Sequence, residues 1–184
     1  MGISGASGAI YGLRLRERPR NQASNCEIHL VMTRSERSRC SLKPANWRLC
    51  GSSRISGIPT RILPARLVSG SFPTDAMVIA PSSIDSMSAI ANGISSNVLI
   101  RAAGVILKER RKLIPMVRES PFHVGHLRNL TILAEMGAII APPVPGFYHQ
   151  PQTVMDLVDH SIDRILDLMG LPDSGVRRWD EGAK

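Results

Sequence analysis

Cationic, acidic and phenolic side chains interrupt two otherwise apolar stretches of this chain, at residues 93–119 and 146–153. Such groups are costly to bury unless an anion or another polar partner meets them. The pattern therefore predicts a site for a phosphate-bearing ligand. The side chains concerned are Arg101, Lys108, Arg118, Glu119 and Tyr148.

The first residues, GISGASGAIYG, predict a tight turn between a strand and a helix. Gly5 and Gly8 permit positive φ and a close approach of the backbone. Ser7 adds a hydroxyl near the helix N-terminus, where amide N–H groups and the helix dipole favour an anion. A strand–helix turn that binds nothing is the alternative interpretation.

Further hydroxyl groups follow two other predicted strands. Thr33 ends one strand, and the SSIDS segment at residues 82–86 follows another. These groups could bind phosphate or the heteroatoms of a ring, or the serines could simply cap the helix that begins after Pro81.

The remaining polar candidates each carry a structural alternative. Arg101 and Lys108 are seven residues apart and therefore share one helix face. Arg118 could form a structural ion pair with Glu119. Tyr148, in a proline-rich loop, could pack on the surface, and Arg164 could reach the same site or extend along apolar surface to water.

The histidines raise the question of a metal. His123 and His126 form an HxxH pair on one predicted helix face, and His149 follows Tyr148. There is no nearby cysteine and no HExxH pattern, so we expect capping or packing roles and no metal.

Strands alternate with helices along the chain, which predicts a doubly wound parallel sheet that binds ligands at the carboxyl ends of its strands. Pro115 within a strand favours an edge or a bulge, and Pro121 suits a first helical turn. The expected strands cover residues 1–4, 27–33, 76–81, 112–117 and 138–141. The expected helices cover 9–18, 83–92, 98–110, 123–136 and 153–169, the last with Val154, Leu157, Val158, Ile162, Ile165 and Leu166 on its apolar face.

Composition narrows the class of protein. The 184 residues suit a single domain, residues 1–184, with a tail at 171–184. The net charge is +8, but residues 34–66 hold eight basic residues and one acid, and Trp47 is their only aromatic residue, so we expect no nucleic-acid binding.

No apolar run approaches the ~18 residues that would span a membrane, and no signal peptide is visible, so we expect a cytoplasmic protein. The three cysteines should be free thiols.

Several longer motifs carry a resemblance to a known family. They are GISGASGAIYG, HLVMT, SGSFPTDAMVIAPSS, the whole of residues 93–119, HVGHLRNLTILAEMGAIIAPPVPGFYHQPQT and the terminal VRRW, about three quarters of the chain. The chain resembles the flavin prenyltransferases of the UbiX/Pad type, which are the small subunits of hydroxyarylic acid decarboxylase systems.

This resemblance implies a flavodoxin-like (Rossmann-type) α/β fold with three αβα layers. It implies transfer of a dimethylallyl group from dimethylallyl phosphate to reduced FMN, giving prenylated FMN for a UbiD-type decarboxylase. It also implies a homo-oligomer, usually a dodecamer, with its site at a subunit junction and no metal.

The resemblance assigns roles residue by residue. Glu119 would be the acid/base at the flavin, and Ser7 would join it as a catalytic residue. The substrate phosphate would be held by Tyr148 and Arg164, with Lys108 and Arg101 nearby. FMN would be held by Gly5, Ala6, Ser7, Thr33, Ser83, Ile84, Asp85, Ser86 and Arg118.

Some positions depart from the family pattern. Either the first strand is short or the true start lies upstream, and Ser82 and Gly104 replace an expected Cys and Asp. Residues 34–66 lack the amphipathic helix and an expected catalytic glutamate, and their composition resembles a frame-shifted reading of the ancestral segment. Sequencing the coding DNA tests this hypothesis, and an intact frame would contradict it.

Three alternatives stay open. The missing glutamate favours a non-catalytic FMN-binding subunit of a decarboxylase system. A nucleotide-dependent dehydrogenase is opposed by Thr33-Arg34 at the end of the second strand, where such enzymes carry an acid, and by the lack of room for a catalytic domain. Cysteine-decarboxylase flavoproteins share the expected fold, but their catalytic histidine and substrate-clamp motifs have no clear counterpart here.

Overall fold

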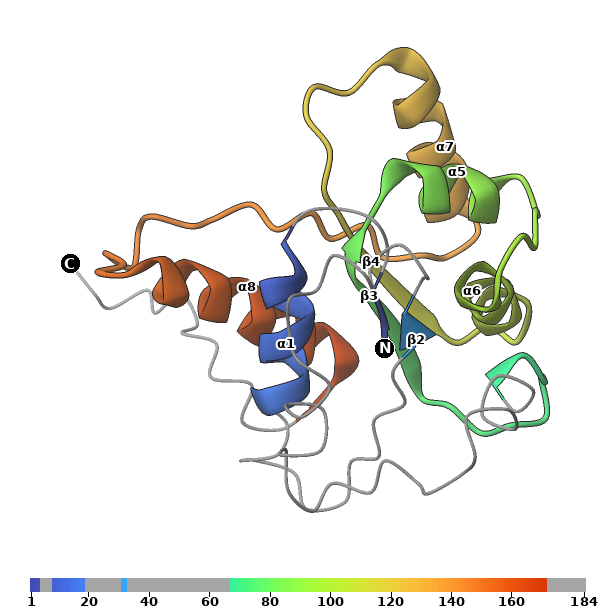
Figure 1. Ribbon diagram of the computed structural model, residues 1–184, viewed down its shortest axis with the longest axis horizontal. Coiled ribbons are helices and arrows are strands. Elements are labelled where there is room, and N and C mark those ends of the chain that lie inside the picture. Colours follow the sequence, from blue (N-terminus) through green and yellow to red (C-terminus); the bar gives the residue numbers. More distant parts are fainter. Residues whose placement is uncertain (4–7, 19–30, 33–66, 172–184) are drawn as a thin grey trace.

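A computed structural model describes residues 1–3, 8–18, 31–32 and 67–171, drawn in colour in Figure 1. These residues include four strands: β1 (Gly2–Ile3), β2 (Val31–Met32), β3 (Ala76–Ser82) and β4 (Lys112–Val117). All pair in parallel, in the order β2-β1-β3-β4. This is the order of a doubly wound sheet. Strands are added on one side of β1 up to β2 and on the other side from β3 onward, so the strand order reverses between β1 and β3. The predicted α/β fold class is confirmed.

The segment after α7 is extended but is not a regular strand. Ile139 N–H donates to the Leu113 carbonyl at 2.8 Å, and Ala141 N–H donates to the Pro115 carbonyl at 3.0 Å. Pro115 has no N–H with which to return a bond, so the ladder is incomplete. The prediction of a strand over 138–141 is therefore wrong in this respect. Among the described residues β4 is the last regular strand on its side, which agrees with the predicted edge position of Pro115.

Helices cover both faces of the sheet (Figure 1). One layer holds α1 and α8. The other holds α5 and α6 against the sheet, with α7 packed on α5. Their bounds are α1 (Ala9–Glu17), α5 (Ile84–Ala91), α6 (Val98–Lys108), α7 (Val124–Glu135) and α8 (Val154–Met169).

Alternation along β3 divides the core into two halves. Val78 and Ala80 pack in the cluster with α1 and α8, whereas Met77 and Ile79 pack in the cluster with α5 and α6. Successive side chains of a strand point to opposite faces, so a strand that is apolar at every position must be covered on both sides. The predicted three layers follow directly from this pattern.

The last helix, α8, has well-defined ends. Thr153 caps its N-terminus in a capping box with Asp156, and Gly170 ends it at a φ of 80°. Val158 and Ile162 are buried as predicted, but Val154 is 73% exposed. Its place on the apolar face was wrongly predicted, because the first turn of α8 extends past the sheet (Figure 1).

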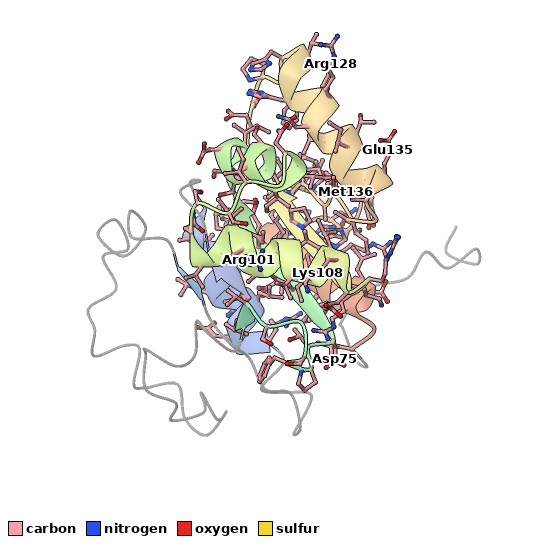
Figure 2. The ribbon with its side chains drawn as sticks, turned by 90° about the vertical axis from the view of Figure 1, so that its right-hand side faces the viewer. Asp75, Arg101, Lys108, Arg128, Glu135 and Met136 are labelled. Atoms are coloured by element: carbon pink, nitrogen blue, oxygen red, sulfur yellow. The ribbon has the colours of Figure 1, made fainter. Side chains whose placement is uncertain are left out.

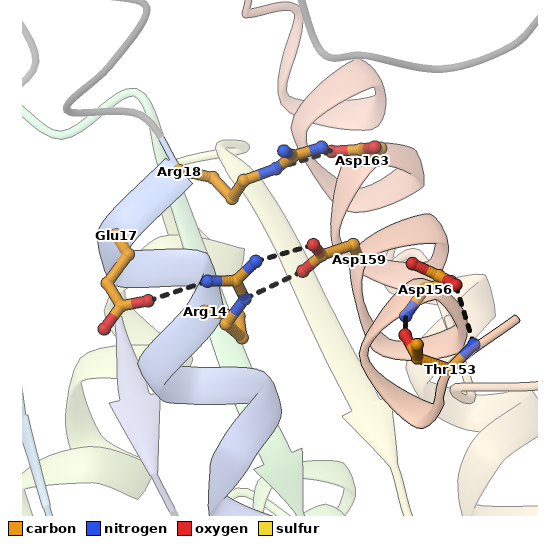
Figure 3. Close-up of polar contacts among 7 residues, drawn as sticks. All are labelled: Arg14, Glu17, Arg18, Thr153, Asp156, Asp159 and Asp163. Atoms are coloured by element: carbon orange, nitrogen blue, oxygen red, sulfur yellow. Dashed lines mark hydrogen bonds and ion pairs between the residues drawn. The ribbon is translucent and has the colours of Figure 1, made fainter.

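Part-buried ion pairs join α1 to α8 (Figure 3). Arg14 donates two hydrogen bonds to the Asp159 carboxylate, at 2.8 and 2.6 Å, and Arg18 pairs with Asp163. The hydrogen bond to Asp159 raises the pKa of Arg14. A bidentate pair of this kind fixes the angle between two helices as well as contributing charge.

The start of α7 differs slightly from the prediction. His123 is the N-cap of α7, and Pro121 lies before the cap instead of inside the first turn. No helix in the described part of the chain is long and apolar enough to cross a membrane.

Candidate functional site

The carboxyl end of β3 gathers three serines. Ser83 is the N-cap of α5: its Oγ accepts the Ser86 N–H at 3.3 Å and donates to the Ser86 Oγ at 3.1 Å. The capping interpretation of Ser83 is therefore confirmed. Capping also leaves the Ser86 hydroxyl hydrogen available to another acceptor, since that oxygen accepts the bond from Ser83.

Ser82 carries the most unusual hydroxyl of this edge. It is fully buried, and its Oγ has no hydrogen-bond partner among the described residues. Leaving a buried hydroxyl without a partner costs about 1–3 kcal/mol. A hydroxyl of this kind, at the ligand-binding edge of a doubly wound sheet, fits a polar ligand group that would complete its bonding.

Arg118 follows β4 directly and brings a cation to the same edge. Its backbone N–H donates to the Ser82 carbonyl at 3.0 Å, and its side chain is exposed. The Arg118 Cδ lies 3.7 Å from the place where a Cβ on Gly8 would stand. Gly8 itself has a φ of 100°, a conformation that favours glycine. Three loops that are far apart in sequence therefore meet here.

Other residues predicted for this edge divide into two groups. Ile84 packs partly buried against the core, so only its backbone faces the loop, while Asp85 is exposed in the first turn of α5. The structure does not describe the second group, which consists of Gly5, Ala6, Ser7 and Thr33.

Glu119 stands next to Arg118 at the end of β4. It is exposed, and its Oε1 accepts the Ser120 backbone N–H at 3.0 Å. One carboxylate oxygen is thus held by the backbone, which fixes the direction of the other. A carboxylate fixed in this way, yet open to solvent, can exchange protons with a ligand at the edge.

Arg101 and Lys108 lie on the outer surface of α6, where Figure 2 shows both. Both are exposed, and the Lys108 Nζ lies 3.0 Å from a carboxylate oxygen of Glu109. Their shared helix face is confirmed, but the expectation of buried cations is wrong. The opposite face of α6, with Leu99 and Ala103, fills the core, which leaves the charged face to water.

Tyr148 belongs to a separate cluster at the start of α8, because its loop runs away from the sheet edge (Figure 1). The Tyr148 hydroxyl lies 3.3 Å from the His160 Nε2. The rings of His149 and His160 stack at 4.3 Å and 21°. Burial, and then His149, lower the pKa of His160 below its ordinary value. The prediction that the Tyr148 loop lies at the same edge as Arg118 is not met within one chain.

Arg164 lies four residues after His160 on α8 and is therefore its neighbour on the helix surface. It is exposed and pairs with Asp167 at 2.5 Å. Sequence reasoning missed His160 and Asp167. The spacing of His160 from Arg164 was the available signal, but the contact with Tyr148 depends on how the loop folds back.

Two of the histidines have the capping and packing roles expected of them. His123 caps α7 by accepting the Gly125 N–H at 3.0 Å, and its ring lies 3.4 Å from that of His126. His149 packs against its neighbours, as described above. Capping and packing roles are thus confirmed for His123 and His149.

The flavoprotein family matches residues 1–165 of this chain. The flavin prenyltransferase UbiX of Salmonella typhimurium is 45% identical over 174 residues, which are 94% of this chain and 91% of the relative. A crystal structure of AnUbiX (PadA1) in complex with FMN and dimethylallyl pyrophosphate has a TM-score of 0.82 at 34% identity, covering 99% of this chain and 96% of that one. A dodecameric FMN-dependent UbiX-like decarboxylase from Escherichia coli O157:H7 has a TM-score of 0.80 at 34% identity, covering 97% of both chains.

The identity extends over nearly the whole chain, and the flavodoxin-like architecture is shared. Both the loops at the carboxyl edge of the sheet and the Tyr148 loop fall within the matched residues. The chain therefore belongs to the flavoprotein family and, within it, to the flavin prenyltransferases of the UbiX type.

Proposed function

We propose that this protein transfers a dimethylallyl group from dimethylallyl phosphate to reduced FMN. The observation that carries the proposal is the meeting of Arg118, the turn at Gly8 and the serines after β3 at one edge of the sheet. This edge combines a cation, hydroxyl groups and the amide groups of a helix N-terminus, which together suit a flavin nucleotide.

The FMN site would combine described and undescribed residues. Arg118, Ser83, Asp85, Ser86 and the backbone of Ile84 would hold FMN from the loops after β3 and β4. The first turn and the end of the second strand would supply Gly5, Ala6, Ser7 and Thr33. When bound, reduced FMN supplies the nucleophilic atoms that accept the prenyl group.

The phosphate of the substrate is the leaving group, so it gains charge as its bond to carbon breaks. Tyr148, in the loop before α8, and Arg164, in the C-terminal half of α8, would bind this phosphate. Hydrogen-bond donors that bind the phosphate more tightly as its charge develops lower the free-energy barrier to transfer. Arg101 and Lys108 lie on the outer face of α6, so we assign them to the site of a neighbouring copy in a homo-oligomer, expected to be a dodecamer.

Proton handling would fall to Glu119 and Ser7. Glu119 offers a fixed, solvent-accessible carboxylate beside Arg118, and a carboxylate at this position can move a proton to or from the flavin ring. Prenylated FMN would leave the protein to serve a UbiD-type decarboxylase.

Mass spectrometry of the flavin tests this proposal. The purified protein is incubated anaerobically with reduced FMN and dimethylallyl phosphate, and the flavin is then extracted. We expect a mass increase of one C5 prenyl unit. Tyr148→Phe should reduce the yield of that product, whereas Arg128→Ala, a change of an exposed arginine on α7, should not.

A second candidate function is a non-catalytic FMN-binding subunit of an aromatic acid decarboxylase system. It is favoured by residues 34–66, whose one acid is Glu36 and in which the catalytic glutamate expected from the family is missing. In that case the same experiment would return bound but unmodified FMN. Loss of flavin binding altogether would contradict both functions.

A further inference from the structure

The cluster at the start of α8 contains one imidazole, that of His160, to which neither the motifs nor the proposed site assign a role. His160 lies 3.3 Å from the Tyr148 hydroxyl, and the two rings meet edge to face at 5.5 Å and 82°. Tyr148 remains 66% exposed. The phenol is therefore held from the protein side while its outer side stays open to a ligand.

The direction of the hydrogen bond decides what Tyr148 can do. A phenol has one hydrogen to donate. If Tyr148 donated that hydrogen to the His160 Nε2, it could offer an anion only lone pairs, which would repel it. If instead His160 donates from Nε2, the phenol hydrogen stays available to a phosphate oxygen, and the bond that the phenol accepts strengthens the one that it donates.

The surroundings of His160 keep its ring in one orientation. The His149 ring stacks on it at 4.3 Å, and both nitrogens of His149 are buried without a hydrogen-bond partner among the described residues. Buried polar groups without partners are rare and costly. In the stacked pair, the His149 nitrogens make no hydrogen bond to the described residues, and the stacking holds the plane of the His160 ring.

Gly146 closes the cluster from the loop side. A Cβ at this position would stand 2.8 Å from the Tyr148 Cε1 and 3.1 Å from the His160 Nε2. Only a residue without a side chain allows the loop to press the phenol ring against the imidazole. The contact between Tyr148 and His160 is thus enforced by the backbone on one side and by His149 on the other.

Arg164 completes the arrangement, four residues after His160 on the same helix surface. Burial lowers the pKa of His160, so its ring is neutral at neutral pH and has one N–H to place. We infer that His160 is a positioning residue, whose Nε2–H donates to the Tyr148 hydroxyl and so directs the phenol hydrogen, beside Arg164, to the phosphate of the substrate. This inference rests on the proposed function.

The test is a double-mutant cycle on binding of dimethylallyl phosphate, measured by calorimetry on protein loaded with oxidised FMN so that transfer does not follow. Losing one hydrogen bond next to a charged ligand corresponds to a Kd about tenfold higher, which we expect for His160→Leu. His160→Gln, whose amide N–H can replace Nε2–H, should stay within about threefold of the unchanged protein. In a Tyr148→Phe background, His160→Leu should have no further effect.

Two controls separate this role from a structural one. His126→Leu removes one imidazole of the other histidine pair, His123 and His126 at the start of α7, and should leave the Kd for the phosphate ester unchanged. The Kd for FMN and the melting temperature should be the same for His160→Gln and the unchanged protein.

The inference is overturned if His160→Leu binds dimethylallyl phosphate like the unchanged protein, or if it weakens binding equally with and without the Tyr148 hydroxyl. Failure of the proposed function looks different: the protein with its natural residues would then not bind the phosphate ester at all.

Discussion

At the scale of single residues, Arg118 is the side chain that joins the separate loops of the edge. Its backbone is bonded to Ser82, and its side chain reaches the turn at Gly8. The pairing of β3 with β4 fixes the backbone of Arg118, so this cation is placed at the edge before a ligand binds. Placement before binding reduces the entropy that the ligand must overcome.

Removing this cation should weaken flavin binding. A hydrogen bond to a charged group contributes about 1.5–3 kcal/mol, so we expect Arg118→Ala to raise the Kd for FMN by at least about tenfold. Quenching of flavin fluorescence measures this Kd. Arg128→Ala, an equal loss of charge on α7, should not change it, and an Arg118→Ala protein that binds FMN normally would remove Arg118 from the site.

At the scale of elements, α8 contributes both to the core and to the cluster of Tyr148, His149 and His160, where we propose that the substrate phosphate binds. Its N-terminal capping box holds the loop that carries Tyr148. The Asp156 Oδ2 accepts the Thr153 N–H at 2.8 Å, and the Thr153 Oγ1 accepts the Asp156 N–H at 3.2 Å (Figure 3). The same Asp156 oxygen accepts the Gln152 N–H at 2.9 Å. The loop and the helix are therefore coupled through Thr153.

Thr153→Ala removes one half of the capping box. Loss of an N-cap side chain costs about 1 kcal/mol, which corresponds to a fall of roughly 2–4 °C in melting temperature for a chain of this size. Thermal unfolding followed by circular dichroism measures it. Thr131→Ala, at a threonine inside α7 whose hydroxyl donates to the Leu127 carbonyl, is the matched control and should lower the melting temperature less.

Asp156 makes the other half of the box sensitive to pH. The backbone hydrogen bonds from Thr153 and Gln152 lower the pKa of Asp156 below its model-compound value of 3.8. A carboxyl whose pKa is lowered by folding stabilises the protein above the unfolded pKa and loses that contribution as pH falls through the folded pKa.

We therefore expect Asp156→Asn to lower the melting temperature at pH 7 and to lower it progressively less below about pH 4. Unfolding curves for both proteins over this range measure the difference. A gap between the two melting temperatures that stays constant down to pH 2 would contradict the role of the charge.

At the scale of the whole molecule, one chain keeps its phosphate-binding candidates apart. Arg101 and Lys108 lie on α6, in the helical layer opposite α8, which carries His160 and Arg164. Arg101, Lys108 and Arg164 are exposed, whereas His160 is half-buried. An oligomer that brings α6 of one copy to α8 of another would unite them.

Mixed oligomers test this arrangement. Lys108→Ala and Arg164→Ala should each be nearly inactive alone, but co-expression should restore part of the prenyl transfer, because some junctions then contain both natural residues. Arg101→Ala mixed with Lys108→Ala is the control: both changes lie on α6, so no junction is repaired. Equal recovery in the two mixtures would show that the residues do not act across copies.

The sequence by itself determined the order and nearly all the bounds of the described elements. Strands β3 and β4 and helices α5 to α8 begin and end within about two residues of their predicted ends, because hydrophobic period, caps and glycine act locally. The longer motifs also identified the family, since they carry the residues of several loops at once.

Only the tertiary structure decided which side chains meet. Pro115 turned an expected fifth strand into an incomplete ladder because the missing N–H faces the 138–141 segment. The cations of α6 stayed exposed because the opposite face of that helix fills the core. The contact between Tyr148 and His160 depends on a loop that folds back over twelve residues, and no local pattern encodes such a path: it is set by close packing at Gly146 and by the stacked ring of His149.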